Sequence, residues 1–206
     1  MPRKSRAEAE QTRQAILDRA GALGSAEGLE ALSLGRLAAD LHLSKSGVIG
    51  HFDAKEHLQV EAVTTAVSRF TEEVWDPVAD RPEGLPRLRA AMDAWLGFLE
   101  RDVYPGGCFL TAAAHEFDDR PGPIRDVLAA AWRQWHAVLM RDVVLAQRAG
   151  DLPESREPAQ VTFVLHAVVT QANFTRRLLD DDTALDRARA EIDAVLSPPP
   201  GRPAPA

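Results

Sequence analysis

The sequence predicts an all-α fold. Apolar residues recur with the three- and four-residue spacing of a helix from about residue 12 to about residue 196, and no segment shows the sustained two-residue alternation of a strand. Residues that cap or interrupt helices stand at the ends of these periodic segments. With 206 residues, 45% of them hydrophobic, the chain is long enough to bury a core without disulfides or a bound metal.

The first predicted helix begins near Thr12 and carries an apolar series from Ile16 to Leu23. It ends near Gly24 and Gly28, because glycine commonly terminates helices. Together with two shorter helices that follow, it predicts a three-helix domain over residues 1–53.

The two shorter helices lie in the segment SLGRLAADLHLSKSGVIGHF, residues 33–52. Ser33 and Ser44 each precede one of them, where a serine hydroxyl accepts an N–H group of the first helical turn. The shared core would consist of Leu34, Leu37, Ala38, Leu41, Leu43, Val48 and Phe52. Two short helices with a tight connection are typical of a helix-turn-helix, although an ordinary helical hairpin shows the same pattern.

The outer face of the second short helix favours DNA binding. It would present Lys45, Ser46, Gly47, Gly50 and His51. A helix with two exposed glycines can approach a major groove closely, although each glycine costs the helix about 1 kcal/mol relative to alanine. Lys45 can donate to guanine or to a phosphate, and His51 can donate to a phosphate.

Charge is unevenly distributed along the chain. The net charge is −7, yet residues 1–55 hold eight basic and seven acidic residues, while the remainder holds 16 and 24. Arg3, Lys4 and Arg6 form a basic arm without acidic residues. This distribution suits a nucleic-acid binder whose contact surface is confined to its N-terminal end, and a solubilising tail would have the same composition.

The rest of the chain predicts a helical body over residues 54–196. The helices are expected at about 54–75, 85–101, 108–117, 124–148, 159–180 and 185–196. Three prolines in DPVADRPEGLP separate the first two, because proline lacks the N–H group that continues a helix. The tail SPPPGRPAPA, residues 197–206, has five prolines in ten residues and is predicted to be disordered.

The predicted helix at 159–180 differs from the others because apolar residues fall on nearly every side of its helical wheel. A helix that is apolar all round must be buried all round. We expect its second face to meet another subunit, together with the helix at 124–148, in a four-helix homodimer interface. A central helix in the core of a monomer is the alternative.

The body also supplies candidates for a small-molecule site, which is typically apolar and aromatic with a few polar groups. The candidates are Trp95, Phe98, Cys108, Phe109, His115, Trp132, Trp135, His136, His166 and Asn173. A packed core needs the same aromatic residues, so no ligand is assigned. His115 and Glu116 point about 100° apart on a helix, and no second histidine lies one turn away. No catalytic site, metal site or cofactor is therefore predicted.

Residues 12–63 resemble the N-terminal domain of the TetR family of transcriptional regulators. The matching positions are Thr12, Ile16, Gly28, Ser33, Leu37, Ala38, Leu43, Ser44, His51, Phe52 and Lys55. Gly24 stands where the family usually has Phe, Leu41-His42 replaces the common Ala-Gly of the turn, and Ile49 replaces a Tyr that commonly touches the DNA backbone. The segment PGGCFLTAAAHEFDDRPGPIRD resembles an actinobacterial-type branch, which the ratio of 21 arginines to three lysines also suits.

The resemblance implies a homodimer in which each N-terminal domain binds one half-site of a double-stranded DNA operator. The helix from about residue 54 would link this domain to a ligand-sensing body, and Lys55 at its start can hold a phosphate. A small-molecule effector would release the DNA by changing the spacing of the two domains. The residues expected at the DNA are Arg3, Lys4, Arg6, Ser33, Ser44, Lys45, Ser46, Gly47, Ile49, Gly50, His51 and Lys55.

We therefore predict a ligand-responsive DNA-binding regulator, most simply a repressor, rather than an enzyme. A helical protein that binds a small molecule or a partner without DNA is the alternative, because the second short helix is atypical at Ile49 and Gly50. The single cysteine, Cys108, excludes an intrachain disulfide. The absence of a signal peptide or a long apolar stretch favours a cytoplasmic protein without a membrane partner.

Overall fold

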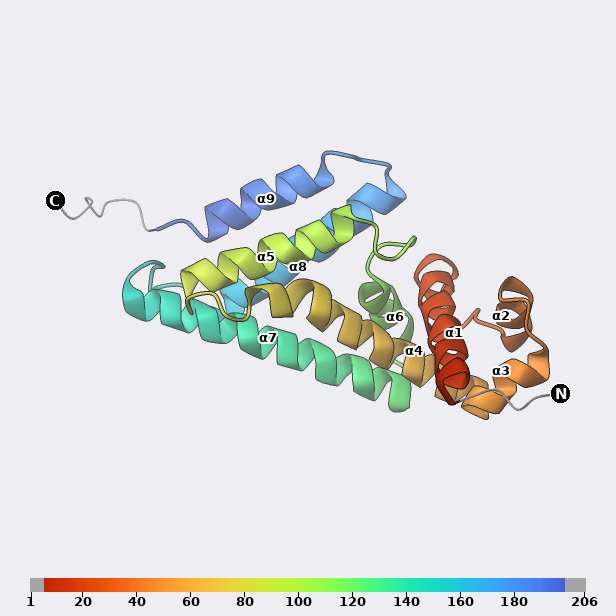
Figure 1. The fold of residues 1–206 in the computed structure, drawn as a ribbon. Coiled ribbons are helices and arrows are strands. Elements are labelled where there is room, and N and C mark those ends of the chain that lie inside the picture. The colour runs from red at the N-terminus through yellow and green to blue at the C-terminus, as the bar shows by residue number, and fades with distance from the viewer. Residues whose placement is uncertain (1–5, 199–206) are drawn as a thin grey trace. The chain divides into compact units, whose positions relative to one another are not determined.

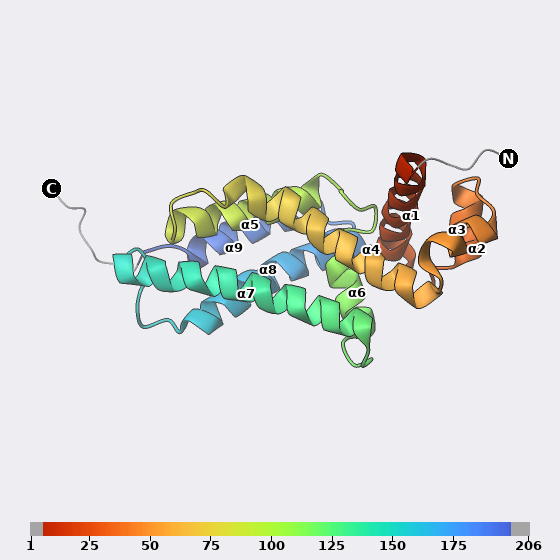
Figure 2. The same ribbon diagram turned by 60° about the horizontal axis from the view of Figure 1, so that its bottom comes forward.

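The computed structural model describes residues 6–198, and every regular element in this range is helical, which confirms the all-α class. The α-helices are α1 Arg6–Glu27, α2 Leu34–Asp40, α3 Lys45–Phe52, α4 Lys55–Phe70, α5 Leu85–Glu100, α6 Phe109–Phe117, α7 Pro123–Ala149, α8 Pro158–Leu178 and α9 Ala184–Val195 (Figure 1 and Figure 2). Most predicted helix bounds are confirmed within one or two residues, but α1 starts well before Thr12.

The helix predicted to run to Trp75 changes its character at Phe70. A π-helical turn, Thr71–Trp75, and a 3₁₀ turn, Asp76–Val78, connect α4 to the loop before α5. Pro77 has no N–H group to extend a helical ladder, so the chain leaves the helix here. The predicted disordered tail, with residues 199–206, lies outside the described residues except at its first two positions.

The described chain divides into two compact units. The first comprises residues 6–69 and 102–131, and the second comprises residues 70–101 and 132–198. The first unit therefore holds α6 in addition to α1, α2 and α3, and α6 packs on α1. The functional division expected after residue 53 stays a prediction.

The core of the first unit follows the predicted pattern. Ile16, Leu37, Val48 and Phe52 are fully or almost fully buried, so the apolar sides of α1, α2 and α3 meet as expected. The guanidinium of Arg13 lies over the ring of Phe52 at 5.1 Å from its centroid. These contacts fix α3 on the rest of the unit and leave its other side free.

The turn between α2 and α3 explains the histidine found where the family usually has glycine. His42 adopts φ 54°, the left-handed conformation that a residue past a helix end often takes. The N–H of His42 donates to the Ala39 carbonyl, and the N–H of Leu43 donates to the Ala38 carbonyl at 2.8 Å. This pair of bonds is a Schellman motif, so the turn keeps its geometry without glycine.

The C-terminal half of α1 presents small residues to the segment before and within α6. A Cβ atom at Gly24 would lie 2.6 Å from the ring of Phe109, and one at Gly21 would lie 2.8 Å from the ring of Tyr104. The departure from Phe at position 24 therefore has a physical reason. The aromatic ring that fills this space comes from Phe109 on another element.

In the second unit α5, α8 and α9 pack against one another (Figure 1). Leu88, Met92 and Trp95 of α5 are fully buried, and so are Leu139 of α7 and Leu165 of α8. These residues form the apolar core expected of the helical body. No helix in the described range is long and apolar enough to cross a membrane.

An ion pair is buried beside this core. The Arg87 guanidinium donates from Nε and Nη2 to the two Asp142 carboxylate oxygens at 2.9 and 2.8 Å, and the N–H of Gly84 donates to Asp142 at 3.1 Å. The side chains are only 7% and 1% exposed. The hydrogen bonds that the guanidinium donates to Asp142 raise the pKa of Arg87 above its usual value, so this guanidinium stays charged. The pair spans α5 and α7, which the sequence does not reveal.

Candidate nucleic-acid interface and effector site

Helix α3 is held by its cap and by two buried side chains. The hydroxyl of Ser44 accepts the N–H of Gly47 at 3.0 Å, and Ser33 caps α2 in the same way through the N–H of Arg36. Both predicted caps are thereby confirmed. Val48 and Phe52 anchor the inner side of α3.

The outer side of α3 is open to solvent. Lys45, Ser46, Gly47 and Gly50 are exposed, Ile49 is 37% exposed, and His51 is half-buried. A Cβ atom at Gly50 would meet no other atom within 4 Å, so packing does not require glycine there. The absence of a side chain at Gly50 therefore has no explanation within the fold of its own unit, whereas a Cβ atom at Gly47 would lie only 3.1 Å from the Ser44 hydroxyl oxygen.

Charge pairing distinguishes Lys45 from several basic neighbours. The guanidinium of Arg19 donates to Asp40 at 2.6 and 2.8 Å and holds the pKa of that carboxyl below its usual value. Arg36 also contacts Asp40, and Arg13 is paired with Glu61. Lys45, in contrast, is exposed and has no ionic partner among the described residues. Its ammonium group is available to a phosphate or a base.

Other predicted DNA contacts have different surroundings. The Nζ of Lys55 donates to the backbone carbonyl of Glu30 at 2.6 Å and lies 3.8 Å from its carboxylate. Arg6 is exposed at the start of α1, whereas Arg3 and Lys4 lie outside the described residues. The DNA roles of all these residues stay predictions.

The second unit gathers six of the predicted ligand-binding residues into one aromatic cluster with Phe70. The six are Trp95, Phe98, Trp132, Trp135, His136 and His166. Phe70 stands edge-on to Trp95 and Trp135, with ring centroids 5.7 and 5.1 Å apart. The remaining four candidates do not belong to these ring contacts. Phe70 was not predicted as a site residue, because an apolar position at a helix end gives no signal of what it will meet.

Some polar atoms of the aromatic cluster are hydrogen-bonded to each other, and others are not hydrogen-bonded. The imidazoles of His136 and His166 share a hydrogen bond of 2.9 Å between Nε2 and Nδ1, and burial lowers the pKa of His136. The indole nitrogens of Trp95 and Trp135 are buried and have no hydrogen-bond partner among residues 6–198. A buried indole N–H usually finds a partner, and leaving a donor unsatisfied costs about 1–3 kcal/mol. The cluster therefore contains two unused donors.

Three of the other candidates lie in the first unit. Cys108 is the buried residue before α6, and Phe109 packs against Gly24 and Tyr104. His115 is exposed, and its Nδ1 lies 2.9 Å from the Thr111 carbonyl oxygen. Asn173 is on α8 in the second unit. Cys108, Phe109 and His115 thus belong to a different compact unit from the residues of the aromatic cluster.

An apolar stripe runs along the outer side of α8. Phe163, Phe174 and Leu178 are 65%, 51% and 63% exposed, and Ala167 between them is also exposed. At 100° per residue these four side chains fall within about 60° of a helical wheel. The prediction that this helix has a second apolar face not covered by the rest of its unit is confirmed.

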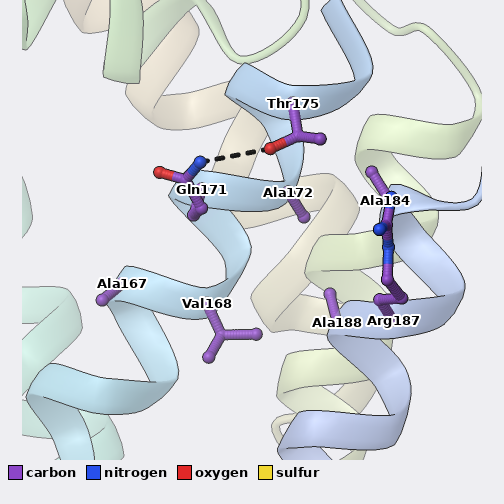
Figure 3. Close-up of a pocket in the computed structure, with 8 residues that line it drawn as sticks. All are labelled: Ala167, Val168, Gln171, Ala172, Thr175, Ala184, Arg187 and Ala188. Carbon is purple, nitrogen blue, oxygen red and sulfur yellow. Dashed lines mark hydrogen bonds between the residues drawn. The ribbon is translucent and has the colours of Figure 1, made fainter. Parts of the chain in front are cut away.

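Two open grooves flank the seam between α8 and α9. One, of about 430 Å³, is lined on α8 by Ala167, Val168, Gln171, Ala172 and Thr175, and on α9 by Ala184, Arg187 and Ala188. Figure 3 shows Val168 and Ala172 of α8 on the side toward Ala184 and Ala188 of α9, and the Gln171 amide bonded to Thr175. The other groove, of about 530 Å³, lies at the opposite ends of the two helices and includes Val161 and Val195. The first groove is lined mostly by small residues, whereas the second also has long polar side chains such as Arg156 and Glu191.

Comparisons with known proteins agree with this architecture. Residues 84–192, more than half of the chain, match the family described as "Tetracyclin repressor-like, C-terminal domain". No curated protein matches the chain by sequence.

Solved structures share the fold over nearly the whole chain. A TetR transcriptional regulator from Chloroflexus aurantiacus superposes with a TM-score of 0.82 at 22% identity, over 91% of this chain and 94% of that one. A TetR-family regulator from Agrobacterium tumefaciens gives 0.82 at 16% identity, over 92% and 99%. AibR, solved with isovaleryl coenzyme A and operator DNA, gives 0.75 at 21% identity, over 90% and 98%. Family match and fold together show that the chain belongs to the TetR family of ligand-responsive, DNA-binding transcriptional regulators.

Proposed function

We propose that this regulator is a homodimeric, cytoplasmic repressor whose α3 helices read the two halves of an operator. The exposed outer face of α3 carries the proposal, because Lys45 has no ionic partner within the described part of the chain and Gly50 is free of packing constraints. An α-helix fits the major groove, and the N-terminal domains of the two subunits must reach successive major grooves about 34 Å apart. The composition of the chain, rich in arginine, further supports an origin in the actinobacterial-type branch. No catalytic step forms part of this proposal.

The second copy of the chain is the proposed occupant of the α8 surface. Four apolar side chains in one stripe, beside a groove lined mostly by small residues, suit a self-complementary two-fold contact in which aromatic side chains enter that groove of the partner. An interface that holds a permanent dimer buries on the order of 2,000 Å² or more and is largely apolar. Met140 on α7 is 40% exposed and could extend the contact.

Selection of DNA duplexes from a random library tests operator binding directly. The wild-type chain should enrich a two-fold symmetric sequence, and Lys45→Ala should bind that duplex about 1–3 kcal/mol more weakly if the ammonium contacts a base. Arg148→Ala is the matched control, because it removes one exposed positive charge from α7, far along the chain from α3. Equal losses in the two variants, measured by fluorescence anisotropy, would assign the effect to net charge rather than to α3.

The aromatic cluster is the proposed effector site. Its unused indole donors call for an acceptor oxygen, and its ring surfaces call for an apolar body. The guanidinium of Arg87, 5.3 Å from the ring of Trp75, is already paired with Asp142, so it offers no free charge to an anion. We therefore propose a neutral, mostly apolar effector with a carbonyl-type oxygen.

The Trp135→Phe variant tests how much the acceptor oxygen of such an effector contributes to affinity, independently of its apolar body. The variant keeps an aromatic ring but deletes the indole N–H, so carbonyl-bearing aromatic probes should bind about tenfold more weakly. Matching hydrocarbons without the oxygen should bind the variant and the wild type alike. Calorimetric titration with both probe sets measures the difference. Equal binding of the carbonyl probes to both proteins would contradict the role of this donor.

A further inference from the structure

The loop between α1 and α2 is held by side chains from two other helices. Both backbone N–H groups of Leu29 and Glu30 donate to the Glu116 carboxylate of α6, at 2.7 Å each. The Leu29 carbonyl accepts from the Gln59 amide at 2.8 Å, and the Glu30 carbonyl accepts from Lys55 at 2.6 Å. Every backbone polar group of these two residues is therefore bonded to a side chain of α4 or α6.

This loop leads directly into the DNA-reading helices. Leu29 is fully buried, and the segment from Gly28 to Ser33 separates the end of α1 from the start of α2. Gly28 has φ 91°, so the chain reverses here in a conformation that glycine favours. The orientation of α2, and of α3 packed on it, consequently depends on where the two peptide groups are held.

The position of Glu116 is itself fixed against α1. The N–H of Gly106 donates to the Ser25 hydroxyl at 3.0 Å, and a Cβ atom at Gly106 would lie 1.8 Å from the Ser25 carbonyl oxygen. Phe109 fills the space over Gly24 in the same contact. Since α6 begins at Phe109, these contacts fix where Glu116 lies relative to the α1–α2 loop.

We infer that Glu116 is a positioning residue for operator binding, because its carboxylate holds the α1–α2 loop that orients the helix-turn-helix. The inference rests on the proposed operator binding and adds a residue that touches no DNA. A carboxylate can accept both N–H groups at once, whereas a glutamine has one acceptor oxygen and places an NH₂ group against the second donor.

Two isosteric variants of equal charge test this role in the full-length chain. Glu116→Gln and Asp119→Asn each remove one negative charge from the same stretch, but the exposed Asp119 carboxylate does not contact the loop. Loss of negative charge alone should leave DNA binding equal or slightly tighter. For the duplex that the wild type selects, we expect Glu116→Gln to bind about tenfold more weakly and Asp119→Asn to bind no more weakly. Binding of a scrambled duplex should not fall in either variant, since phosphate contacts do not require an oriented α3.

A second variant distinguishes positioning from general damage to the fold. Gln59→Met removes the donor to the Leu29 carbonyl at a position that is 5% exposed. The double variant of Gln59→Met and Glu116→Gln should lose less affinity than the product of the two single losses. The reason is that both substitutions act on the same loop. All assays use protein quantified by stoichiometric DNA titration, so unfolded chains do not count. Equal affinity of Glu116→Gln and wild type for the selected duplex, or equal losses for selected and scrambled duplexes, would overturn the inference. A wild-type chain that selects no duplex overturns the proposed function as well.

Discussion

Replacing Phe174 by glutamate should dissociate the dimer and reduce operator binding by more than about 100-fold, because linking two half-site contacts multiplies their affinity. Phe174 stands in the middle of the α8 stripe, so two-fold symmetry would bury two unpaired carboxylates in an apolar contact. Burial of an unpaired charge costs several kcal/mol, which exceeds what the remaining contacts of a partly disrupted stripe can offset. Sedimentation should then show a species near 22.5 kDa in place of twice that mass.

Phe174→Leu is the matched control, because it keeps an apolar side chain at the same position. This variant should stay dimeric and bind the selected operator nearly as well as the wild type, since hydrophobic substitutions of similar size usually cost less than about 1.5 kcal/mol. A dimeric Phe174→Glu protein that still binds the operator would place the subunit contact elsewhere on the chain.

Asp142→Ala should destabilise the protein by about 3–5 kcal/mol, because it leaves the Arg87 guanidinium buried without its partner. The substitution also removes the acceptor for the Gly84 N–H, at a residue with φ 87° where the chain enters α5. The ring of Trp75 near Arg87 cannot replace a carboxylate that accepts two hydrogen bonds. Urea unfolding followed by circular dichroism measures the loss.

The apolar double variant Arg87→Met with Asp142→Leu should be considerably more stable than Asp142→Ala. Replacing a whole buried pair by hydrophobic residues of similar volume is often neutral, whereas removing one partner is not. A decrease of less than about 1 kcal/mol in the free energy of unfolding of Asp142→Ala would mean that water reaches Arg87 in the folded protein. The ion pair would then contribute little to stability despite its burial.

Local features of the sequence predicted the helices well. Ser33 and Ser44 marked helix starts because capping involves only the next few residues. The polar face of α3 and the second apolar face of α8 could be read from helical periodicity for the same reason. The conformation of His42 could not be predicted, because a left-handed turn position is usually occupied by glycine or asparagine.

Contacts between distant segments were beyond the reach of pattern analysis. Two such contacts join residues far apart in sequence, Arg87 with Asp142 and Glu116 with Leu29. The residues next to one partner in sequence do not predict which residue the other partner is. Which of the ligand candidates lie together could not be predicted for the same reason. His115 and His136 look equivalent as letters, yet one is an exposed residue of the first unit and the other is bonded to His166 in the second.

The contact between α1 and the segment around α6 constrains how this protein can exchange parts with its relatives. A recombination event that joined residues 1–53 to a foreign body would leave Tyr104 and Phe109 behind, and the glycines beneath them would face whatever side chains the new body supplied. A relative with Phe at position 24 would in turn collide with Phe109. The small residues of α1 and the aromatic residues near α6 must therefore be inherited together, and a functional chimera would have to transfer residues 102–131 along with residues 1–53.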